Sequence, residues 1–252
     1  MKIFKISTWV ILVLLLVTGC KTKGMVEHLA DADVSYIRLD SSLETDKEIE
    51  ALIAPYREQL ELEMNVVIGS VSQELRKGKP SSNLGNWFSD LLEDSAKKIF
   101  NDSQVDFAVQ NYGGIRLGSI PPGEITKGKI FELMPFDNTL VNVEMDKNTT
   151  QQFLNRIADY GGWPVSRSVS FNIQDSTAVD ILINNKPLED RNYYVVMPDY
   201  VANGGDDCYF LKDSKKVDSG QYLRKVVIDH LLMLEANGIE ADEDPTERIK
   251  IK

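Results

Sequence analysis

Four segments of the chain space their apolar residues as an amphipathic helix does. They are "DKEIEALIAPYREQLELEM" (46–64), "SNLGNWFSDLLEDSAKKIF" (82–100), "TTQQFLNRIADYGG" (149–162) and "SGQYLRKVVIDHLLMLEANG" (219–238). This spacing predicts four helices. Ser82 or Asn83 can cap the second. The third is expected to stop at Gly161, and the fourth to begin at a Ser219 cap and end at Gly238.

Other segments are rich in β-branched residues or alternate apolar and polar positions, as strands do. They are "NVVIGSV" (65–71), "SQVDFAVQN" (103–111), "TLVNVEM" (139–145) and "VDILINNKPLEDRNYYVVMPDYV" (179–201). The last is expected to form two strands around a turn at Asn184-Asn185. Helices, strands and hairpins are interspersed along the chain. The predicted fold class is therefore α/β (α+β), with mixed sheets packed with helices.

The first 20 residues, "MKIFKISTWVILVLLLVTGC", do not fit this folded pattern. Two lysines precede an apolar run that is shorter than the roughly 20 residues of a membrane span. Such a run is typical of a secretory signal peptide, and the ending Val-Thr-Gly-Cys resembles a bacterial lipobox. Residues 1–19 are therefore expected to be a lipoprotein signal peptide, with lipid on Cys20. The alternative is an uncleaved N-terminal anchor.

Beyond the signal peptide, the chain is expected to divide into two parts. Residues 20–42 are polar and mixed, as a tether is, and residues 43–252 carry the folded pattern. About 230 mature residues are enough to bury a core without covalent cross-links. A lipid anchor implies the bacterial cell envelope, on the periplasmic side or on the outer surface, with the membrane reached through the acyl chains.

Charge and cysteine content exclude several classes of partner. The whole chain has a formal net charge of −11; without residues 1–19, Lys+Arg falls from 28 to 26, Asp+Glu stays at 39, and the charge becomes −13. This charge argues against nucleic acid as a partner and against a polybasic grip on anionic lipid. With Cys20 and Cys208 the only cysteines, a disulfide framework and a cysteine-based zinc site are both excluded.

Four stretches at breaks between predicted elements could carry binding chemistry. They are "NLGNWFSD" (83–90), "QNYGGIR" (110–116), "MPFDNTL" (134–140) and "PDYVANGGDD" (198–207). Each also has an ordinary structural interpretation. A Gly-Gly pair is a turn in most proteins, a phenylalanine after proline is more often in the core, and Asn-Gly-Gly-Asp can be a simple β-turn.

In combination and in this order, the four stretches resemble the C-terminal domain of bacterial and animal 5′-nucleotidases. The shared elements are Asn-x-Gly-Asn opening a helix, a strand followed by Asn-x-Gly-Gly-Ile-Arg, then Pro-Phe-x-Asn, then Asp-x-x-Ala-x-Gly-Gly-Asp. The resemblance covers about residues 45–210. It implies a nucleotide-recognition domain, with substrate-binding positions at Asn111, Gly113, Gly114, Arg116, Phe136, Tyr200 and Asp206.

The resemblance also implies a role for each of these positions. The base is expected to stack between Phe136 and Tyr200. At the position of Tyr200, phenylalanine is commoner in the family. Asp206 is expected to accept hydrogen bonds from ribose hydroxyls, and Asn111 to line the nucleoside pocket. Arg116 is expected to face a phosphate, because its planar fork of donors suits that group. The two glycines are expected to let the backbone approach the ligand closely.

Two departures from the family pattern concern the phosphate end. Many relatives carry an arginine just before the Asn-x-Gly-Asn helix, whereas this chain has "RKGKPSS", with Arg76 farther back. Either the grip on phosphate is weaker here, or Lys79 takes the place of that arginine. In addition, Tyr112 stands where the family usually has the first of three glycines.

A third departure concerns catalysis. The family's full enzymes hold two metal ions in a preceding metallophosphatase domain, and such a metal pair performs the hydrolysis. This chain has two histidines, His28 and His230, and none of that domain's metal-binding motifs. We therefore expect no catalytic residues, no metal site and no cofactor on this chain, with divalent metals on a separately encoded partner.

Three functions remain open. The chain can be the substrate-binding half of a split periplasmic nucleotide hydrolase that serves nucleotide catabolism or salvage, a non-catalytic lipoprotein that binds nucleotides or nucleosides, or a scaffold whose pocket has lost its ligand. The five polar and aromatic pocket residues argue against the third.

Overall fold

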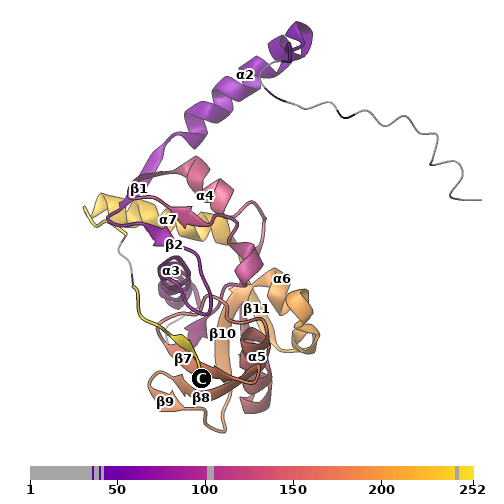
Figure 1. The fold of residues 1–252 in the computed structure, drawn as a ribbon, viewed down its shortest axis with the longest axis vertical. Helices are drawn as coiled ribbons and strands as arrows, with labels where there is room; N and C mark the ends of the chain where they lie inside the picture. Colours follow the sequence, from indigo (N-terminus) through magenta and orange to yellow (C-terminus); the bar gives the residue numbers. More distant parts are fainter. Residues whose placement is uncertain (1–35, 37–39, 41–42, 101–104, 242–243) are drawn as a thin grey trace, which may run out of the picture. The chain divides into compact units, whose positions relative to one another are not determined.

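A computed structural model of the protein describes residues 36, 40, 43–100, 105–241 and 244–252 (Figure 1). The predicted signal peptide, Cys20 and nearly all of the predicted tether lie outside these residues. The chain separates into two units, residues 1–52 and residues 53–252. Within the described residues, no helix is long and apolar enough to cross a membrane.

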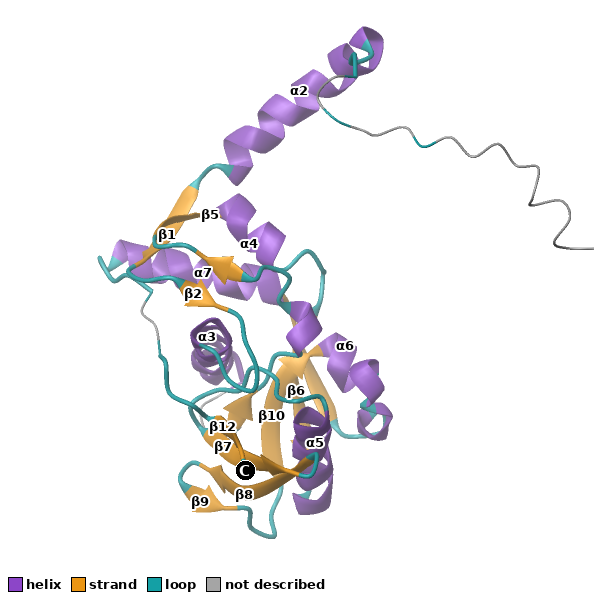
Figure 2. Ribbon diagram, in the orientation of Figure 1, coloured by secondary structure: helices purple, strands orange, loops and turns teal. Residues whose placement is uncertain are grey.

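The four predicted helices are all present (Figure 2). They are α2 (Lys47–Met64), α3 (Asn83–Phe100), α5 (Lys147–Asp159) and α7 (Leu223–Ala236). Two shorter α-helices, α4 (Lys127–Leu133) and α6 (Asp199–Ala202), lie between them. Three short 3-10 helices are η2 (Tyr112–Gly114), η3 (Gly205–Asp207) and η4 (Tyr209–Leu211).

Local capping explains several helix boundaries. Ser82 precedes α3 and caps it, since its hydroxyl accepts a hydrogen bond from the N–H of Gly85 at 3.2 Å. Asp146 caps α5 by accepting from the N–H of Thr149 at 2.7 Å. Gly161 follows α5 with a φ of +83°, as expected for a helix stop.

The start of the last helix differs from the sequence prediction. The cap expected at Ser219 is wrong, because α7 begins at Leu223 and Ser219 lies in strand β11 (Lys216–Tyr222). β11 pairs with strand β6 (Thr139–Met145), with Asp218 opposite Val141. Pairing with a neighbouring strand, which local sequence does not reveal, holds this segment extended.

Helix α2 has the predicted bounds but does not bury its apolar stripe. None of its residues is buried. Pro55 lies inside the helix without ending it. The residues whose spacing predicts the helix are all exposed: Ile49, Leu52, Ile53, Tyr56 and Leu60.

Within the part of the chain that the structure describes, the strands form two four-stranded sheets and two short pairs. The first large sheet has the order β11-β6-β10-β3 and the second the order β12-β7-β8-β9; β1 pairs with β5, and β2 with β4. The remaining strands are β1 (Val67–Val71), β2 (Leu75–Arg76), β3 (Phe107–Ala108), β4 (Ser119–Ile120), β5 (Gly123–Thr126), β7 (Val169–Gln174), β8 (Thr177–Ile183), β9 (Lys186–Pro187), β10 (Tyr193–Pro198) and β12 (Ile249–Ile251).

Both large sheets are mixed, as the sequence predicts. β10 runs parallel to β3 and antiparallel to β6, while β12 runs parallel to β7 and β7 antiparallel to β8. The predicted Asn184-Asn185 turn joins β8 to β9, and both residues have positive φ, as a tight hairpin turn requires. The strand that follows, β10, belongs to the other large sheet. The segment 118–126, for which no strand was predicted, contributes β4 and β5.

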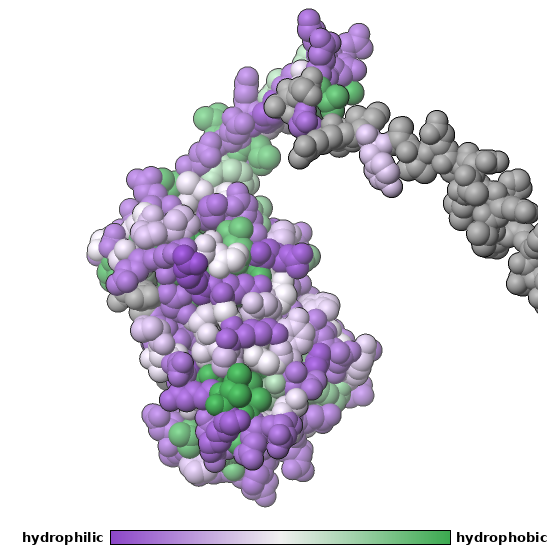
Figure 3. All heavy atoms as spheres, in the orientation of Figure 1, coloured by the Kyte–Doolittle hydropathy of each residue, from purple (hydrophilic) through white to green (hydrophobic). Residues whose placement is uncertain are grey.

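Two apolar clusters form the core of residues 53–252. One joins the inward side chains of β6, β7, β8 and β10 to helix α5, and includes Phe153, Trp163 and Tyr193. The other joins α3, α4 and α7 to β1 and includes Leu84, Phe88 and Leu231. The face seen in Figure 3 is largely hydrophilic, in keeping with the acidic composition.

Cys208 lies in the first cluster as a free thiol, and burial raises its pKa to about 12. It is a packing residue rather than a reactive thiol.

Candidate functional site

Sheet topology brings three of the motif stretches to one edge of the β11-β6-β10-β3 sheet. β3 and β10 are parallel, with Val196 opposite Ala108, so both carboxyl ends lie at the same edge. β6 is antiparallel to β10, with Leu140 opposite Pro198, so its first residues lie at that edge too. The segments after β3, after β10 and before β6 therefore meet there. Ligands commonly bind outside the carboxyl ends of parallel strands.

A pocket of about 380 Å³ opens at this edge, a size within the usual range for small-molecule sites. All seven residues predicted from the sequence line it. An eighth, Asn138, was missed as a site residue, although it is the asparagine of the Pro-Phe-x-Asn motif. The lining consists of Asn111, Gly113, Gly114, Arg116, Phe136, Asn138, Tyr200 and Asp206.

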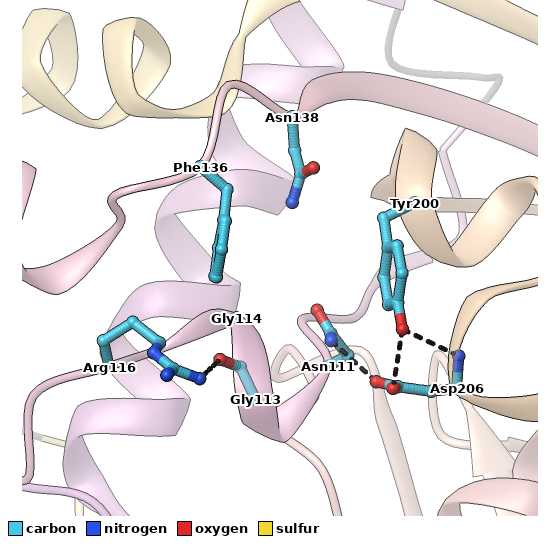
Figure 4. Close-up of a pocket in the computed structure, with 8 residues that line it drawn as sticks. All are labelled: Asn111, Gly113, Gly114, Arg116, Phe136, Asn138, Tyr200 and Asp206. Carbon is cyan, nitrogen blue, oxygen red and sulfur yellow. Dashed lines mark hydrogen bonds between the residues drawn. The ribbon is translucent and has the colours of Figure 1, made fainter.

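Two aromatic rings stand on opposite sides of the pocket (Figure 4). Phe136 comes from the segment between α4 and β6, and Tyr200 from α6. The two residues are 46% and 47% exposed, respectively, so neither is a core aromatic. Asn138 points into the gap between them (Figure 4). Two exposed ring faces across a gap are suited to a flat aromatic ligand.

Asp206 is the acidic group of the pocket and is held by its neighbours (Figure 4). Its Oδ2 accepts a hydrogen bond from Nδ2 of Asn111 at 2.7 Å, and its Oδ1 accepts from the Tyr200 hydroxyl at 3.1 Å. No Lys, Arg or His nitrogen in the described part of the chain lies within 4 Å of this carboxylate. Its negative charge is therefore not neutralised by an ion pair. A carboxylate has about four lone-pair positions, so it can accept further hydrogen bonds from a ligand.

The Tyr200 hydroxyl is fixed at both its donor and its acceptor side. Besides donating to the Asp206 carboxylate, it accepts from the backbone N–H of Asp206 at 3.3 Å. That N–H favours the phenolate, but partial burial and the nearby carboxylate outweigh it, so the pKa of Tyr200 is raised. The hydroxyl therefore stays protonated and keeps the ring oriented at the side of the pocket.

Asn111 is oriented by a second amide. It is 5% exposed, and its Oδ1 accepts a hydrogen bond from Nε2 of the buried Gln110 at 3.0 Å. This bond directs the Asn111 amide nitrogen toward Asp206. Gln110 belongs to the second motif stretch, but its sequence position alone indicated no role for it.

The two glycines of η2 differ in what they accommodate. A Cβ on Gly114 would lie 2.0 Å from Nε2 of Gln110, so this position must be glycine for the Gln110–Asn111 pair to fit. A Cβ on Gly113 would meet only Nδ2 of Asn111, at 3.9 Å. Gly114 is therefore explained by internal packing, and Gly113 leaves open space beside the pocket.

Arg116 is an exposed cation beside the Phe136 ring. Its guanidinium carbon lies 5.6 Å from the ring centroid, and its Nη1 makes a long 3.4 Å contact with the carbonyl of Gly113. Among the described residues, no carboxylate lies within 4 Å of Arg116. Its donors remain available for an anion at the end of the pocket.

Lys79, the alternative to the missing family arginine, does not line the pocket. Its ammonium donates to the carbonyl of Tyr160 and lies 3.9 Å from the Tyr160 ring centroid and 4.8 Å from that of Tyr112. Lys77 lies 3.9 Å from the same Tyr112 ring and donates to the carbonyl of Ile115. Burial, followed by the charges of Arg116 and Lys79, lowers the pKa of Lys77. Both lysine ammonium groups therefore face the Tyr112 ring, and Lys77 is close enough to Arg116 to be affected by its charge.

No metal-binding cluster occurs within the described residues, where no three His, Cys, Asp or Glu side chains come together to hold an ion. His230 lies on α7, and burial lowers its pKa. The pocket itself offers amide, carboxylate and guanidinium groups between two aromatic rings, a lining suited to binding a small polar ligand with a flat ring.

The chain belongs to the family described as 5′-nucleotidase, C-terminal domain. Residues 66–213, more than half of the chain, match that family, and the resemblance inferred from the four motifs is thereby confirmed. The α/β fold class with mixed sheets is also confirmed, because solved structures with a similar fold include a 5′-nucleotidase precursor and a putative 5′-nucleotidase.

Three relatives illustrate the similarity. A 5′-nucleotidase of Vibrio parahaemolyticus is 27% identical over 186 residues, which cover 70% of this chain and 32% of the relative. Protein UshA of Yersinia enterocolitica is 27% identical over 184 residues, with the same coverage. The crystal structure of a 5′-nucleotidase precursor from Thermus thermophilus is 28% identical with a TM-score of 0.67, and the match covers 81% of this chain and 42% of that one. This chain spans about a third of the length of the curated relatives it matches.

Proposed function

We propose that the pocket binds a nucleoside or a nucleoside monophosphate. The base stacks between Phe136 and Tyr200, and the ribose hydroxyls donate to the Asp206 carboxylate. The observation that carries the proposal is the convergence of these three side chains on one pocket in a chain of the 5′-nucleotidase C-terminal family. A base has two flat π-faces, and each stacking contact contributes roughly 1–3 kcal/mol.

Arg116 is proposed to bind the phosphate. It is the one cation that lines the pocket as described, and no carboxylate there neutralises it. Its planar donors fit a phosphate in two-point geometry. Lys77 and Lys79, which lie behind it on the Tyr112 ring, add positive potential without lining the pocket.

Arg116→Ala is expected to weaken the binding of a nucleoside monophosphate about ten- to a hundredfold, since a hydrogen bond to a charged group contributes about 1.5–3 kcal/mol. The affinity for the corresponding nucleoside is expected to stay the same, because a nucleoside offers no charge to Arg116. Titration calorimetry with both ligands makes the comparison. Equal losses of affinity for the two ligands would contradict a phosphate-binding role. Arg116→Lys keeps the charge but not the planar fork of donors, so its affinity for the monophosphate is expected to lie between those of the wild type and Arg116→Ala.

We further propose that the chain is the substrate-binding half of a split nucleotide hydrolase. Its partner is a separately encoded metallophosphatase that carries the divalent metals. Two observations support this: residues 66–213 match the C-terminal domain of the 5′-nucleotidase family, and the described residues hold no cluster suited to metal ions. The second observation also favours the alternative, a lipoprotein that binds nucleotides or nucleosides without catalysis.

A mixing assay separates these two functions. The purified chain alone is expected to release no phosphate from AMP, with or without added divalent metal. A secreted metallophosphatase encoded beside this protein is expected to gain activity toward AMP when the chain is added. No gain, together with intact nucleotide binding, would favour the non-catalytic alternative. Phosphate release by the chain alone, above a matched blank purification, would overturn both.

The proposed location is the bacterial cell envelope, with Cys20 as the lipid-bearing residue after cleavage. The support is the Lys-containing start, the short apolar run and the Val-Thr-Gly-Cys ending of the sequence. Mass spectrometry of the mature protein is expected to show an acylated N-terminal cysteine, and Cys20→Ser is expected to abolish the modification. An intact, unmodified N-terminus on the wild-type protein would show this proposal to be wrong.

A further inference from the structure

The backbone that presents Asp206 adopts a sparsely populated conformation. Gly204, Asp206 and Asp207 have φ values of +96°, +48° and +63°. The two aspartates have side chains, so their left-handed conformation is unfavourable and persists only where surrounding contacts impose it. Such contacts must act on the segment 203–208, which we call the Asp206 loop.

Arg156, on helix α5, grips this loop from outside the pocket. Its Nε donates to the backbone carbonyl of Asp206 at 2.8 Å, and its Nη2 contacts Oδ2 of Asp207 at 2.9 Å. Nη1 is anchored on Asp159, one turn farther along α5, at 2.9 Å. Because the guanidinium is planar, these contacts fix the carbonyl of Asp206 and the side chain of Asp207 relative to a rigid helix.

Lys216, the first residue of β11, holds both flanks of the same loop. Its Nζ lies 2.9 Å from the carbonyl of Ala202 and 3.3 Å from Oδ1 of Asn203 on one side. On the other side it lies 3.4 Å from the carbonyl of Leu211 and 3.0 Å from that of Lys212. Four oxygens surround one ammonium, which has three donors, and no carboxylate in the described residues lies within 4 Å of it.

We infer that Arg156 and Lys216 are positioning residues that set the placement of the Asp206 carboxylate and thereby the affinity for ribose. Neither residue lines the pocket. Each acts on the loop backbone or its flanks, whereas Asn111 and Tyr200 contact the carboxylate itself. The inference about ribose rests on the proposed nucleoside-binding function. The inference about the loop does not depend on any ligand.

The loop is tested first without ligand, by hydrogen exchange followed by mass spectrometry. Arg156→Ala and Lys216→Met are each expected to speed amide exchange in peptides covering residues 199–212 about tenfold, since each removes charged hydrogen bonds to this segment. Peptides from α3 and β7 serve as internal references. The matched controls are Arg191→Ala and Lys215→Met. Arg191→Ala breaks the ion pair between Arg191, which precedes β10, and Asp106, and Lys215→Met breaks the ion pair between Lys215 and Glu144. Unchanged exchange in residues 199–212 in both variants would overturn the inference.

Binding is tested next by a double-mutant cycle. Arg156→Ala is expected to lower ribonucleoside affinity about tenfold and deoxyribonucleoside affinity less, because the positioned group acts on the ribose. In an Asp206→Ala background, Arg156→Ala is expected to cause no further loss of ribonucleoside affinity. A general loss of folded structure in Arg156→Ala would instead lower the ribonucleoside and deoxyribonucleoside affinities equally. In the double mutant, that loss of affinity would add to the one caused by Asp206→Ala.

The two proposals fail in different ways. If the wild-type chain binds no nucleoside, the proposed function is wrong, and the ribose part of this inference falls with it, while the exchange data still decide whether the two cations hold the loop. If the wild type binds and the losses add in the double mutant, the nucleoside site stands and Arg156 is not a positioning residue.

Discussion

Replacing Phe136 with alanine is expected to lower nucleoside affinity by about ten- to a hundredfold, which corresponds to the roughly 1–3 kcal/mol of one base stack. The substitution removes one of the two rings between which the base is proposed to lie. Phe136 is nearly half exposed and outside both core clusters, so the fold is expected to survive. Titration calorimetry on the purified variant gives the dissociation constant, and thermal unfolding confirms that the domain is intact.

Two control variants sharpen this result. Phe136→Tyr keeps a flat ring and is expected to retain most of the affinity. Tyr56→Ala removes an aromatic side chain of comparable size that is exposed on α2, outside the pocket, and is expected to leave binding unchanged. Full affinity in Phe136→Ala would show that the ring is not a stacking surface.

Asp206→Ala is the second substitution with a large expected effect. It removes the acceptor for the ribose hydroxyls and, in the free protein, the acceptor for Asn111 and the Tyr200 hydroxyl. Hydrogen bonds to a charged group contribute about 1.5–3 kcal/mol, so ribonucleoside affinity is expected to fall about ten- to a hundredfold. A 2′-deoxyribonucleoside, which lacks one of the two donors, is expected to lose less.

The ratio of the two affinities is the informative quantity. Wild-type protein is expected to prefer the ribonucleoside, and the preference is expected to shrink in Asp206→Ala. Asp229→Ala, which removes an exposed carboxylate paired with Lys225 on α7, should leave the ratio as it is. An unchanged ratio in Asp206→Ala would mean that this carboxylate does not recognise the ribose.

The elements that local pattern determines were predictable from the sequence. Helix α3 carries a strong apolar stripe and a serine cap, and its bounds came out within a residue of the prediction. Strand β6 has the predicted bounds, although residues 140–143 are all buried rather than alternately buried and exposed. The start of α7 was not predictable, because Ser219 lies within strand β11, between Asp218 and Tyr222, which both pair with β6, and local capping propensity does not reveal that pairing.

The pocket was predictable as a set of residues but not as a network. The family resemblance implied seven site residues, and they line one pocket because the segments after β3, after β10 and before β6 converge at one sheet edge. The contact of the Tyr200 hydroxyl with Asp206 depends on a left-handed backbone at Asp206, which the sequence does not reveal. Neither Arg156 nor Lys216 lies in a motif, and their contacts with the Asp206 loop arise only from tertiary packing.

The nucleoside site is tested by titrating the wild-type protein with adenosine, guanosine, uridine and cytidine and their 5′-monophosphates. We expect saturable binding of at least one nucleoside, with 1:1 stoichiometry, and a gain in affinity when the 5′-phosphate is present for Arg116 to pair with. The absence of binding heat for every ligand up to millimolar concentration, at two temperatures, would contradict it and would leave the pocket as a scaffold without a nucleotide ligand.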